Sequence, residues 1–317
     1  MDDPRKVPAA PRVLDIANPF GAPVYYRENL TSTMDAARAL VLSGLPEFGE
    51  PPGPSAPHGT VIVAGYQSAG RGRAGRPWNM GRGESLPLTL ILRYPALTAI
   101  PQCLTLRAGL ALSLAIEDFV EIAAPPALPA GRVLVKWPND IMLIQTDGRG
   151  KKAAGILAEA AGFSGDSGGT VYLGMGINIA QGEFPPELER KACSIAGTLC
   201  PEESGAGPFR AKLAKGRFIL LEKILVRLYD ELEGSGPEKA QPGTYPAAAD
   251  AVKQTSWRER LLQRLYMRGK PVRFFPGAAG SGGAVKGVLA GVGDAGELLI
   301  AVDGEDRSFV TGELDVY

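Results

Sequence analysis

Runs of apolar residues, separated by turns rich in glycine and proline, predict a protein of short strands and a few buried helices. Residues 60–67, TVIVAGYQ, have the length and β-branched content of a buried strand. Further strands are predicted over residues 86–93, 132–137, 140–145, 153–160 and 170–179. Apolar spacing and flanking cap residues predict helices over residues 29–44, 104–121, 209–233 and 251–267.

The pattern changes after residue 268, where short apolar runs alternate with glycine turns. Four short strands are predicted in KPVRFF, GAVKGVLAGV, GELLIAV and DRSFVTGEL, a pattern typical of a small β-barrel. Two segments rich in proline and glycine, residues 46–58 and 233–243, are predicted to be an insertion and a linker. We therefore expect an N-terminal tail over residues 1–24, a main domain over 25–268 and a small barrel over 269–317.

Composition and charge exclude several classes of protein. The 317 residues carry 34 Lys and Arg against 34 Asp and Glu, and this neutral balance argues against broad nucleic-acid binding. No uninterrupted apolar run approaches the length of a membrane span, and the first residues lack the character of a secretory signal. We therefore expect no membrane association and a cytoplasmic location, with an organelle left open.

Histidine and cysteine are too few and too scattered for several kinds of site. His58 is the only histidine, which argues against a Ser-His-Asp triad or a histidine-rich metal site. The three cysteines form no C-x-x-C pair, so neither a disulfide framework nor a zinc ribbon is predicted. Catalysis would therefore depend on Lys, Arg, carboxylates and backbone dipoles.

The most informative stretch is residues 66–78, YQSAGRGRAGRPW, which we call the arginine loop. It places Arg71, Arg73 and Arg76 between closely spaced glycines. Backbone N–H groups in such a loop form an anion-binding concavity, and guanidinium groups bind phosphate or carboxylate in a bidentate manner. The loop also spells G-x-G-x-x-G, but the prolines and glycines that follow it forbid the helix of a dinucleotide-binding fold. The loop therefore predicts a site for a phosphorylated or carboxylate-bearing small molecule.

Four further segments accompany the arginine loop: TSTMDAAR (residues 31–38), VKWPNDIML (135–143), KKAAGILAEA (151–160) and VYLGMGINIA (171–180). In order and spacing the five segments resemble the biotin protein ligases, across roughly residues 25–180. The resemblance implies an α+β fold in which helices flank a mixed β-sheet, as in class II synthetases, followed by an SH3-like barrel. Too few residues precede the first segment for the DNA-binding arm of repressor-type members, so that arm is expected to be absent.

The resemblance implies an ATP-dependent ligase that forms biotinyl-5'-AMP and transfers biotin to a lysine of a biotin carboxyl carrier domain. Its substrates would be biotin and ATP, with Mg²⁺ entering alongside ATP and no dedicated metal site. Partners would be the carrier domains of biotin-dependent carboxylases and not nucleic acid, and a homodimer stays an open alternative. Two other functions stay open: a lipoate or octanoate ligase of the same fold, and a biotin-sensing protein without turnover.

The same resemblance assigns roles to individual residues. Catalysis is implied for Lys152, Arg71 and Arg73. Biotin contacts are implied for Ser32, Thr33, Met34, Gln67, Gly70, Arg71, Gly72, Arg73, Lys152 and Gly155. Nucleotide contacts are implied for Arg71, Arg73, Arg76, Trp78, Asn139, Asp140, Lys152, Ile177 and Asn178.

Several of these residues have a simpler structural explanation. Ser32 and Thr33 would serve equally as helix caps, and Trp78 as a core residue. Asn139 and Asp140 would either orient Lys136, order their loop or contact Mg²⁺. The chain also departs from the family pattern, since Met34 stands where Asn is common, and Ser85 and Pro87 stand at the positions of an Asn and an aromatic residue. These departures leave the accepted acid open.

Overall fold

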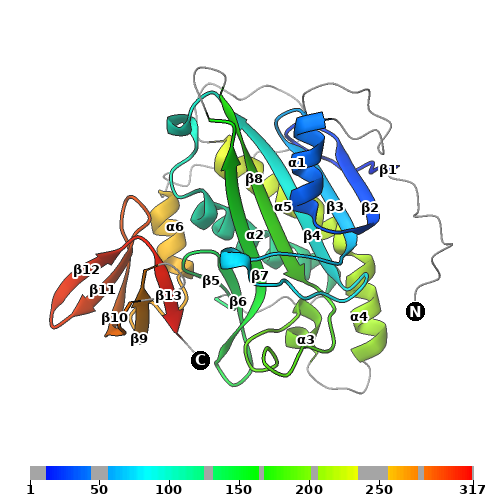
Figure 1. Cartoon of the computed structure of the whole chain (residues 1–317). Helices are drawn as coiled ribbons and strands as arrows, with labels where there is room; N and C mark the ends of the chain where they lie inside the picture. The colour runs from blue at the N-terminus through cyan, green and yellow to red at the C-terminus, as the bar shows by residue number, and fades with distance from the viewer. Residues whose placement is uncertain are drawn as a thin grey trace.

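Two β-sheets organise the protein (Figure 1). The computed structural model describes residues 12–43, 56–124, 131–163, 168–200, 206–234, 256–277 and 282–315. The larger sheet has eight strands in the order β1-β2-β3-β4-β8-β7-β6-β5. They are β1 (Arg12–Val13), β2 (Val24–Leu30), β3 (Thr60–Gln67), β4 (Ser85–Tyr94), β5 (Val133–Lys136), β6 (Asp140–Ile144), β7 (Gly150–Ala161) and β8 (Gly169–Asn178).

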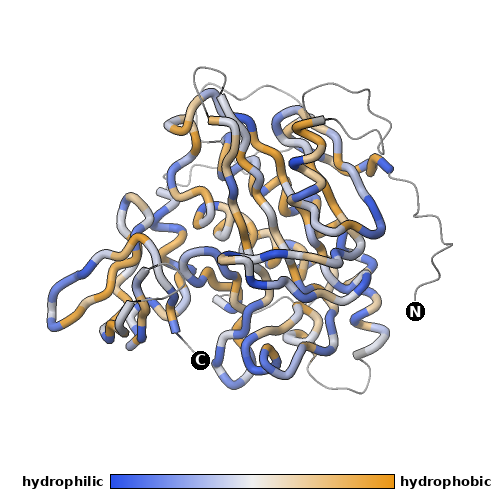
Figure 2. Tube along the Cα trace, viewed as in Figure 1, coloured by the Kyte–Doolittle hydropathy of each residue, from blue (hydrophilic) through white to orange (hydrophobic). Residues whose placement is uncertain are grey.

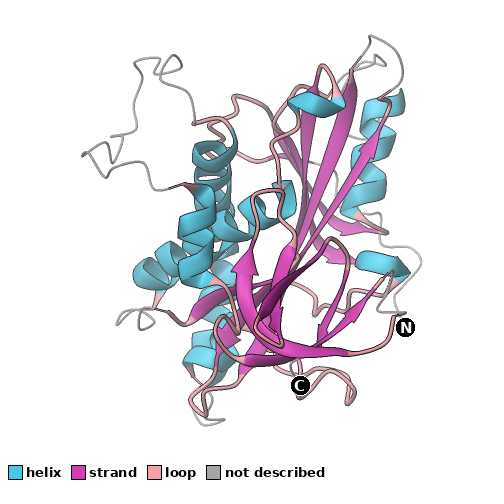
Figure 3. Ribbon diagram, turned by 90° about the vertical axis from the view of Figure 1, so that its left-hand side faces the viewer, coloured by secondary structure: helices cyan, strands magenta, loops and turns pink. Residues whose placement is uncertain are grey.

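Helices cover both faces of the large sheet (Figure 3). On one face, α1 (Thr33–Ser43) packs on β3, β4 and β8. On the other face, α2 (Leu104–Ala123) packs on β5 to β7 and against α5 (Arg217–Leu232). Two shorter helices, α3 (Ile195–Leu199) and α4 (Ala206–Lys215), lie against each other, and α6 (Trp257–Arg264) packs on α2. The fold class predicted from the sequence is confirmed.

Strand β8 shows how one strand serves two different faces. Its side chains alternate between the faces of the sheet, as pleated geometry requires. Val171, Leu173, Met175 and Ile177 belong to the large hydrophobic core that includes α2 and α5. Tyr172 belongs to a second, smaller core beneath α1, and Gly174 and Gly176 lie next to Met34 and Trp78. The two glycines leave room on the α1 face, and this room becomes part of the candidate site.

Helix α2 lies in a long apolar segment of the described chain. The segment Leu97–Ala123 has a mean hydropathy of 1.5 and is long and apolar enough to cross a membrane by length and composition. More than half, 56%, of an 18-residue window within this segment is buried inside the protein. Its apolar character is accounted for by the core, because α2 is covered by the large sheet on one side and by α5 on the other. Figure 2 shows the hydrophobic residues following the strands and helices, with hydrophilic residues mainly in the turns between them.

Several element boundaries differ from the predicted ones for physical reasons. Helix α1 begins at Thr33 and not at residue 29, because β2 continues to Leu30 in parallel pairing with β3. The helix predicted over residues 209–233 is two helices, α4 and α5, that meet at Gly216. A Cβ at Gly216 would lie 3.1 Å from the Phe119 ring, so the glycine lets α2 approach closely. Strands β1 and β2 and helix α3 were not predicted.

The C-terminal sheet is antiparallel, with five strands in the order β12-β11-β10-β9-β13. They are β9 (Pro271–Pro276), β10 (Val285–Val292), β11 (Leu298–Val302), β12 (Glu305–Phe309) and β13 (Gly312–Asp315), so the last predicted strand is in fact two. Most of the predicted insertion, the predicted linker from residue 235 onward, and the first residues of the last predicted helix lie outside the described residues. The described part of that helix, α6, begins with a capping box between Ser256 and Glu259.

Side chains hold the C-terminal sheet against the large one. Trp137, at the turn after β5, donates its indole N–H to the Gly296 carbonyl at 2.9 Å. The same indole packs edge-on against the Phe274 ring, with 6.0 Å between ring centroids. Val135 of β5 also forms a bridge to Leu265, directly after α6. The two sheets therefore share a buried contact next to the β5–β6 turn.

Candidate functional site

A cavity of about 520 Å³ opens on the α1 face of the large sheet. The start of α1, the arginine loop, the β5–β6 turn, strands β7 and β8, and strand β13 of the C-terminal sheet supply its walls. Most residues singled out in the sequence line it: Ser32, Thr33, Met34, Gln67, Arg71, Gly72, Arg73, Arg76, Trp78, Asn139, Asp140, Lys152, Gly155 and Asn178. The fold therefore brings together five segments that are dispersed along the chain.

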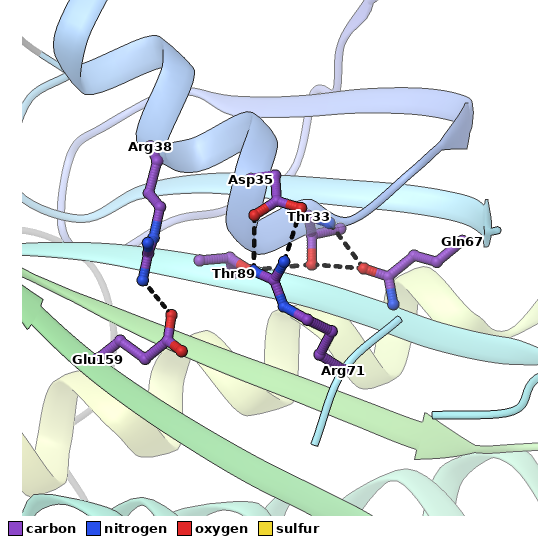
Figure 4. Close-up of polar contacts among 7 residues, drawn as sticks. All are labelled: Thr33, Asp35, Arg38, Gln67, Arg71, Thr89 and Glu159. Atoms are coloured by element: carbon purple, nitrogen blue, oxygen red, sulfur yellow. Dashed lines mark hydrogen bonds and ion pairs between the residues drawn. The ribbon is translucent and has the colours of Figure 1, made fainter. Parts of the chain in front are cut away.

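One end of the cavity carries a buried chain of hydrogen bonds (Figure 4). The backbone N–H and the hydroxyl of Thr33 both donate to Gln67 Oε1, at 2.7 and 2.9 Å. Thr89 donates its hydroxyl to Thr33 Oγ1 at 2.9 Å. Because Gln67 Oε1 accepts two bonds, the amide is oriented with its N–H₂ group as the remaining polar end. This end of the cavity is therefore suited to a ligand that carries a carbonyl acceptor.

The three loop arginines lie along the cavity and each contacts a protein acceptor. Arg71 forms a bidentate ion pair with Asp35 of α1, with N–O distances of 2.6 and 3.1 Å (Figure 4). Arg73 donates to Asn139 Oδ1 at 3.1 Å. Arg76 pairs with Glu313 of β13 at 2.6 Å. The loop is thus tied to three different walls of the cavity.

Two lysines add positive charge near the β5–β6 turn. Lys152 Nζ lies 2.6 Å from Asp140 Oδ1 and 5.3 Å from the centre of the Trp78 ring. Lys136 is only 7% exposed, and burial lowers its pKa below that of a free lysine, partly offset by the carboxylate of Asp140. Asn139 holds the turn between them, since its amide donates to the Ile156 carbonyl at 2.7 Å.

The indole of Trp78 lies over a pair of glycines. Gly155 of β7 and Gly176 of β8 are register partners on neighbouring strands. A Cβ at Gly176 would lie 2.5 Å from Trp78 Cε2, and one at Gly155 would lie 3.1 Å from Trp78 Cζ3. Neither glycine has positive φ, so space and not backbone conformation explains them. Trp78 thus lies flat on the floor of the cavity and not in either hydrophobic core of the described chain.

Two polar atoms beside the cavity lack a hydrogen-bond partner among the described residues. Asn178 is 3% exposed; its amide nitrogen donates to the Cys193 carbonyl at 3.2 Å, and its Oδ1 is unpaired. The indole N–H of Trp78 is buried without an acceptor. Buried polar groups are nearly always paired in folded proteins, so two unpaired atoms of this kind indicate a ligand or water site.

The structure places two predicted residues away from the cavity. Ile177 faces the opposite side of the large sheet, in the core beneath α2, so its side chain does not line the cavity. Gly70 is buried under the arginine loop, where a Cβ would lie 2.9 Å from Gln67 Nε2 and 3.0 Å from the Trp78 carbonyl. Gly70 therefore lets the loop close against Gln67, and it does not face the cavity itself.

Other lining residues were not among the predicted site residues. Lys136 lies in the KWPND motif and could have been chosen for that reason. Phe275 and the residues of β13 also line the cavity, although we predicted no ligand contact in the C-terminal segment. No local signal in that segment indicates a site, since β13 reaches the cavity only through the packing of the two sheets.

Cys193 lies nearer the site than its position in the sequence indicates. Its backbone N–H donates to the Lys152 carbonyl at 2.9 Å. Its thiol is buried, and burial raises the pKa to about 11. A thiol that stays protonated at neutral pH is a poor nucleophile, which argues against a covalent acyl-cysteine intermediate at this position. Among the described residues, no group of three or more His, Cys, Asp or Glu is placed to hold a metal ion.

Comparisons with known proteins agree with this geometry. The profile of the biotin/lipoate A/B protein ligase family matches residues 52–178. A biotin–[acetyl-CoA-carboxylase] ligase from Paracoccus denitrificans is 31% identical over 239 residues, covering 75% of this chain and 82% of that protein. The chain belongs to the biotin/lipoate A/B protein ligase family. The resemblance to biotin protein ligases seen in the sequence is thereby confirmed.

Other relatives differ in length or show only the fold. The bifunctional ligase/repressor BirA of Bacillus subtilis is 35% identical over 180 residues, and the chain spans about half of its length, 47%. A point mutant of the biotin protein ligase from Aquifex aeolicus, solved in complex with biotin, superimposes with a TM-score of 0.60 at 23% identity. That match covers 93% of this chain and 98% of the Aquifex chain, and it shows that the fold of this ligase family extends over both sheets.

Proposed function

We propose that this protein joins biotin to a lysine of a biotin carboxyl carrier domain, with biotinyl-5'-AMP as the intermediate and ATP as the energy source. The observation that carries the proposal is the cavity itself. It combines a neutral hydrogen-bonding end at Thr33 and Gln67 with a cationic region at Arg73, Lys136 and Lys152. Biotin has the matching layout, with a neutral ureido ring at one end of its chain and a carboxylate at the other.

The cationic region suits the first chemical step. In that step a carboxylate oxygen of biotin attacks the α-phosphorus of ATP, the bond to the bridging oxygen breaks, and pyrophosphate leaves. Two anions must therefore approach each other, and fixed cations reduce their repulsion and stabilise the transition state. Lys152 is held by Asp140 at 2.6 Å, and Arg73 is held by Asn139 at 3.1 Å, so both cations are oriented in advance. No protein nucleophile is required.

The nucleotide would occupy the region around Trp78 and Asn178. The flat indole offers a stacking surface for a base, and the unpaired Asn178 Oδ1 would accept a hydrogen bond from an amino group. Mg²⁺ would arrive bound to the phosphates. The described residues build no carboxylate cluster for it, and Asp140, the predicted contact, is paired with Lys152.

In the second step the amine of the carrier lysine attacks the acyl carbon of the adenylate. AMP leaves, an amide bond forms, and the amine releases its proton to solvent or a nearby base. The Paracoccus denitrificans relative supports this acceptor class, since that ligase is named for its acceptor, acetyl-CoA carboxylase. A structure of Aquifex aeolicus biotin protein ligase in complex with biotin and ATP supports the two small substrates.

The direct test is to incubate the protein with ATP, Mg²⁺ and one acid at a time, and to identify the product by mass. Biotinyl-5'-AMP with biotin, and little adenylate with lipoate or octanoate, is the expected result. Adenylate formation with lipoate or octanoate in preference to biotin would replace the proposal by the lipoate or octanoate alternative. Biotin binding in calorimetry without any adenylate would identify a sensing protein.

A pair of neighbouring lysines provides the matched residue test. Lys152→Ala should reduce the rate of adenylate formation about a hundredfold or more, because one oriented charge contact is lost from the transition state. Lys151→Ala is the control, since Lys151 donates to the Glu189 carbonyl at an exposed position outside the cavity. Equal rates for wild type and a correctly folded Lys152→Ala protein would remove Lys152 from the catalytic group.

A further inference from the structure

A methionine and a glycine fit together at the neutral end of the cavity, beside Thr33 and Gln67. Met34, in the first turn of α1, is 4% exposed and lines the cavity, as does Gly174 of β8. A Cβ at Gly174 would lie 2.8 Å from Met34 Sδ and 3.2 Å from Met34 Cγ. The thioether therefore occupies the space that any other side chain at residue 174 would take.

The glycine is required for space and not for its backbone conformation. Gly174 is not among the residues with positive φ, and it pairs in regular antiparallel register with Thr89 of β4 and Leu157 of β7. An alanine could adopt this extended conformation without strain. What it could not do is leave Met34 where it is, because a non-bonded contact of 2.8 Å to a carbon is strongly repulsive.

The Met34–Gly174 contact lies directly beside the chain of hydrogen bonds at the neutral end of the cavity. Thr89, the register partner of Gly174, donates to Thr33 Oγ1, and Thr33 precedes Met34 in α1. One wall of this end is thus polar and directional, and the adjoining wall is an apolar thioether. Methionine has three rotatable bonds and a polarizable sulfur, so its wall adapts to the shape of what it contacts.

We propose that Met34, seated against Gly174, is a specificity-determining residue that sets the ring size accepted at the neutral end of the cavity, beside Thr33 and Gln67. The proposal rests on the proposed function, and it names the class of acid: a carboxylic acid whose far end joins a polar ring edge to an apolar, sulfur-sized ring face. The Thr33–Gln67 wall selects for the polar edge. Met34 limits the apolar face, because its position decides the depth of that part of the cavity.

Calorimetry on the full-length chain tests this with two ligands, biotin and desthiobiotin. Desthiobiotin keeps the ureido ring and the carboxylate chain but lacks the sulfur that closes the second ring. Gly174→Ala should push Met34 into the cavity and weaken biotin binding about tenfold or more, the range expected for a group of methyl size in an apolar pocket. Desthiobiotin binding should weaken less, so the ratio of the two dissociation constants should shift.

Second-site variants separate specificity from packing. Met34→Ala combined with Gly174→Ala should recover biotin affinity to within a few-fold of wild type. The alanine at residue 34 leaves room for the new Cβ at residue 174, so no side chain is pushed into the cavity. Gly291→Ala is the matched control. Gly291 lies in β10 of the C-terminal sheet, away from the cavity, and a Cβ there would lie 3.0 Å from Leu262 Cδ2 of α6. The Gly291→Ala substitution should leave the affinity ratio unchanged.

Three results would count against these expectations. Variants that melt at lower temperature but bind both ligands with the wild-type ratio would show that Met34 and Gly174 act only in packing, and the inference would be wrong. A Gly174→Ala defect that the double variant does not rescue would also overturn it. Wild-type protein that binds neither ligand would instead refute the proposed function, a result visible before any variant is made.

Discussion

The two faces of the large sheet are built from the same strands but bury different kinds of side chain. On the face beneath α2 and α5, side chains such as Leu173, Ile177 and Phe119 form one continuous apolar core. On the α1 face, fully or nearly buried polar residues gather instead: Ser32, Thr33, Gln67, Thr89, Lys136, Asn139 and Asn178. Because side chains alternate along each strand, the two environments lie on opposite faces of one sheet.

The difference teaches where stability and specificity reside. The α2 face gains free energy from removing apolar surface from water, and its interactions are mostly non-directional. The α1 face buries groups that need partners, and some of them, such as Asn178 Oδ1, have none among the described residues. A ligand that supplied those partners would be bound by groups whose desolvation has already taken place. The following predictions test this division, beginning with the largest expected effect.

On the α2 side, the buried carboxylate of Glu231 should contribute to the stability of the fold and not to ligand binding. Glu231 of α5 is 3% exposed and pairs with Arg107 of α2 at 2.9 Å and with Arg260 of α6 at 2.7 Å. Glu231→Gln leaves buried positive charge uncompensated and should reduce the free energy of unfolding by about 3–5 kcal/mol. Urea unfolding measures this loss.

Two observations check the Glu231 prediction. Glu222→Gln makes the same chemical change at a less buried position of the same helix, and it should shift stability by less than about 0.5 kcal/mol. The folded Glu231→Gln protein should bind biotin and ATP as wild type does. A clear loss of ligand affinity in the folded state would mean that the two faces are not separable.

The buried Lys136 on the α1 face should make nucleotide binding depend on pH. Burial lowers the pKa of Lys136, against the opposing effects of Asp140, Glu313 and Asp315 and with help from Lys152. Between this lowered pKa and that of a free lysine, the folded protein holds Lys136 neutral while the unfolded chain is protonated. The free energy of unfolding therefore rises with pH through that window, whereas attraction for phosphate falls.

ATP affinity measured by calorimetry from neutral to alkaline pH tests this. As the pH rises towards the pKa of a free lysine, the ATP affinity of wild type should fall about tenfold. The reason is that a charged hydrogen bond, which contributes roughly 1.5–3 kcal/mol, is lost when Lys136 becomes neutral. Lys136→Arg keeps its charge throughout and should lack this loss. An identical alkaline decline in both proteins would assign it to another group.

The smallest expected effect concerns the surface ion pair that holds Arg71. Asp35→Asn should free the Arg71 guanidinium for phosphate and tighten ATP binding by up to about fivefold, the range of an exposed ion pair. Glu159→Gln is the control, because Glu159 pairs with Arg38 on the same helix but away from the cavity (Figure 4). Weaker ATP binding in Asp35→Asn would show that Asp35 orients Arg71 for the ligand instead of competing with it.

Local pattern accounts for much of the fold. The buried strands β3 and β4, the helix α2 and the strands β5 to β8 were predictable, because long apolar runs and strong turns leave few alternatives. Strand β2 was missed because its second half, RENL, is polar and reads as the start of the following helix. The break at Gly216 was missed because its cause, the approach of Phe119, is a tertiary contact that no local window contains.

The candidate site divides in the same way. Residues in compact motifs, such as Arg73 in the arginine loop and Lys152 in KKAAGIL, reach the cavity as expected. The side chain of Ile177 lies in the core beneath α2 and does not line the cavity, because a motif names neighbours along a strand without stating which of them share a face. The contribution of β13 depends on how two sheets dock through Trp137, and sequence motifs carry no information on that docking.

Strand β13 also has a consequence for how the protein is made. The ribosome releases the walls formed by α1, the arginine loop and β5 to β8 long before Gly312–Asp315, the residues that close the cavity beside Arg76. A nascent chain can therefore fold most of its large sheet while its ligand cavity still lacks one side. Since a ligand stabilises only the state that binds it, any ligand of this cavity would favour chains whose synthesis has passed β13 over those interrupted before it.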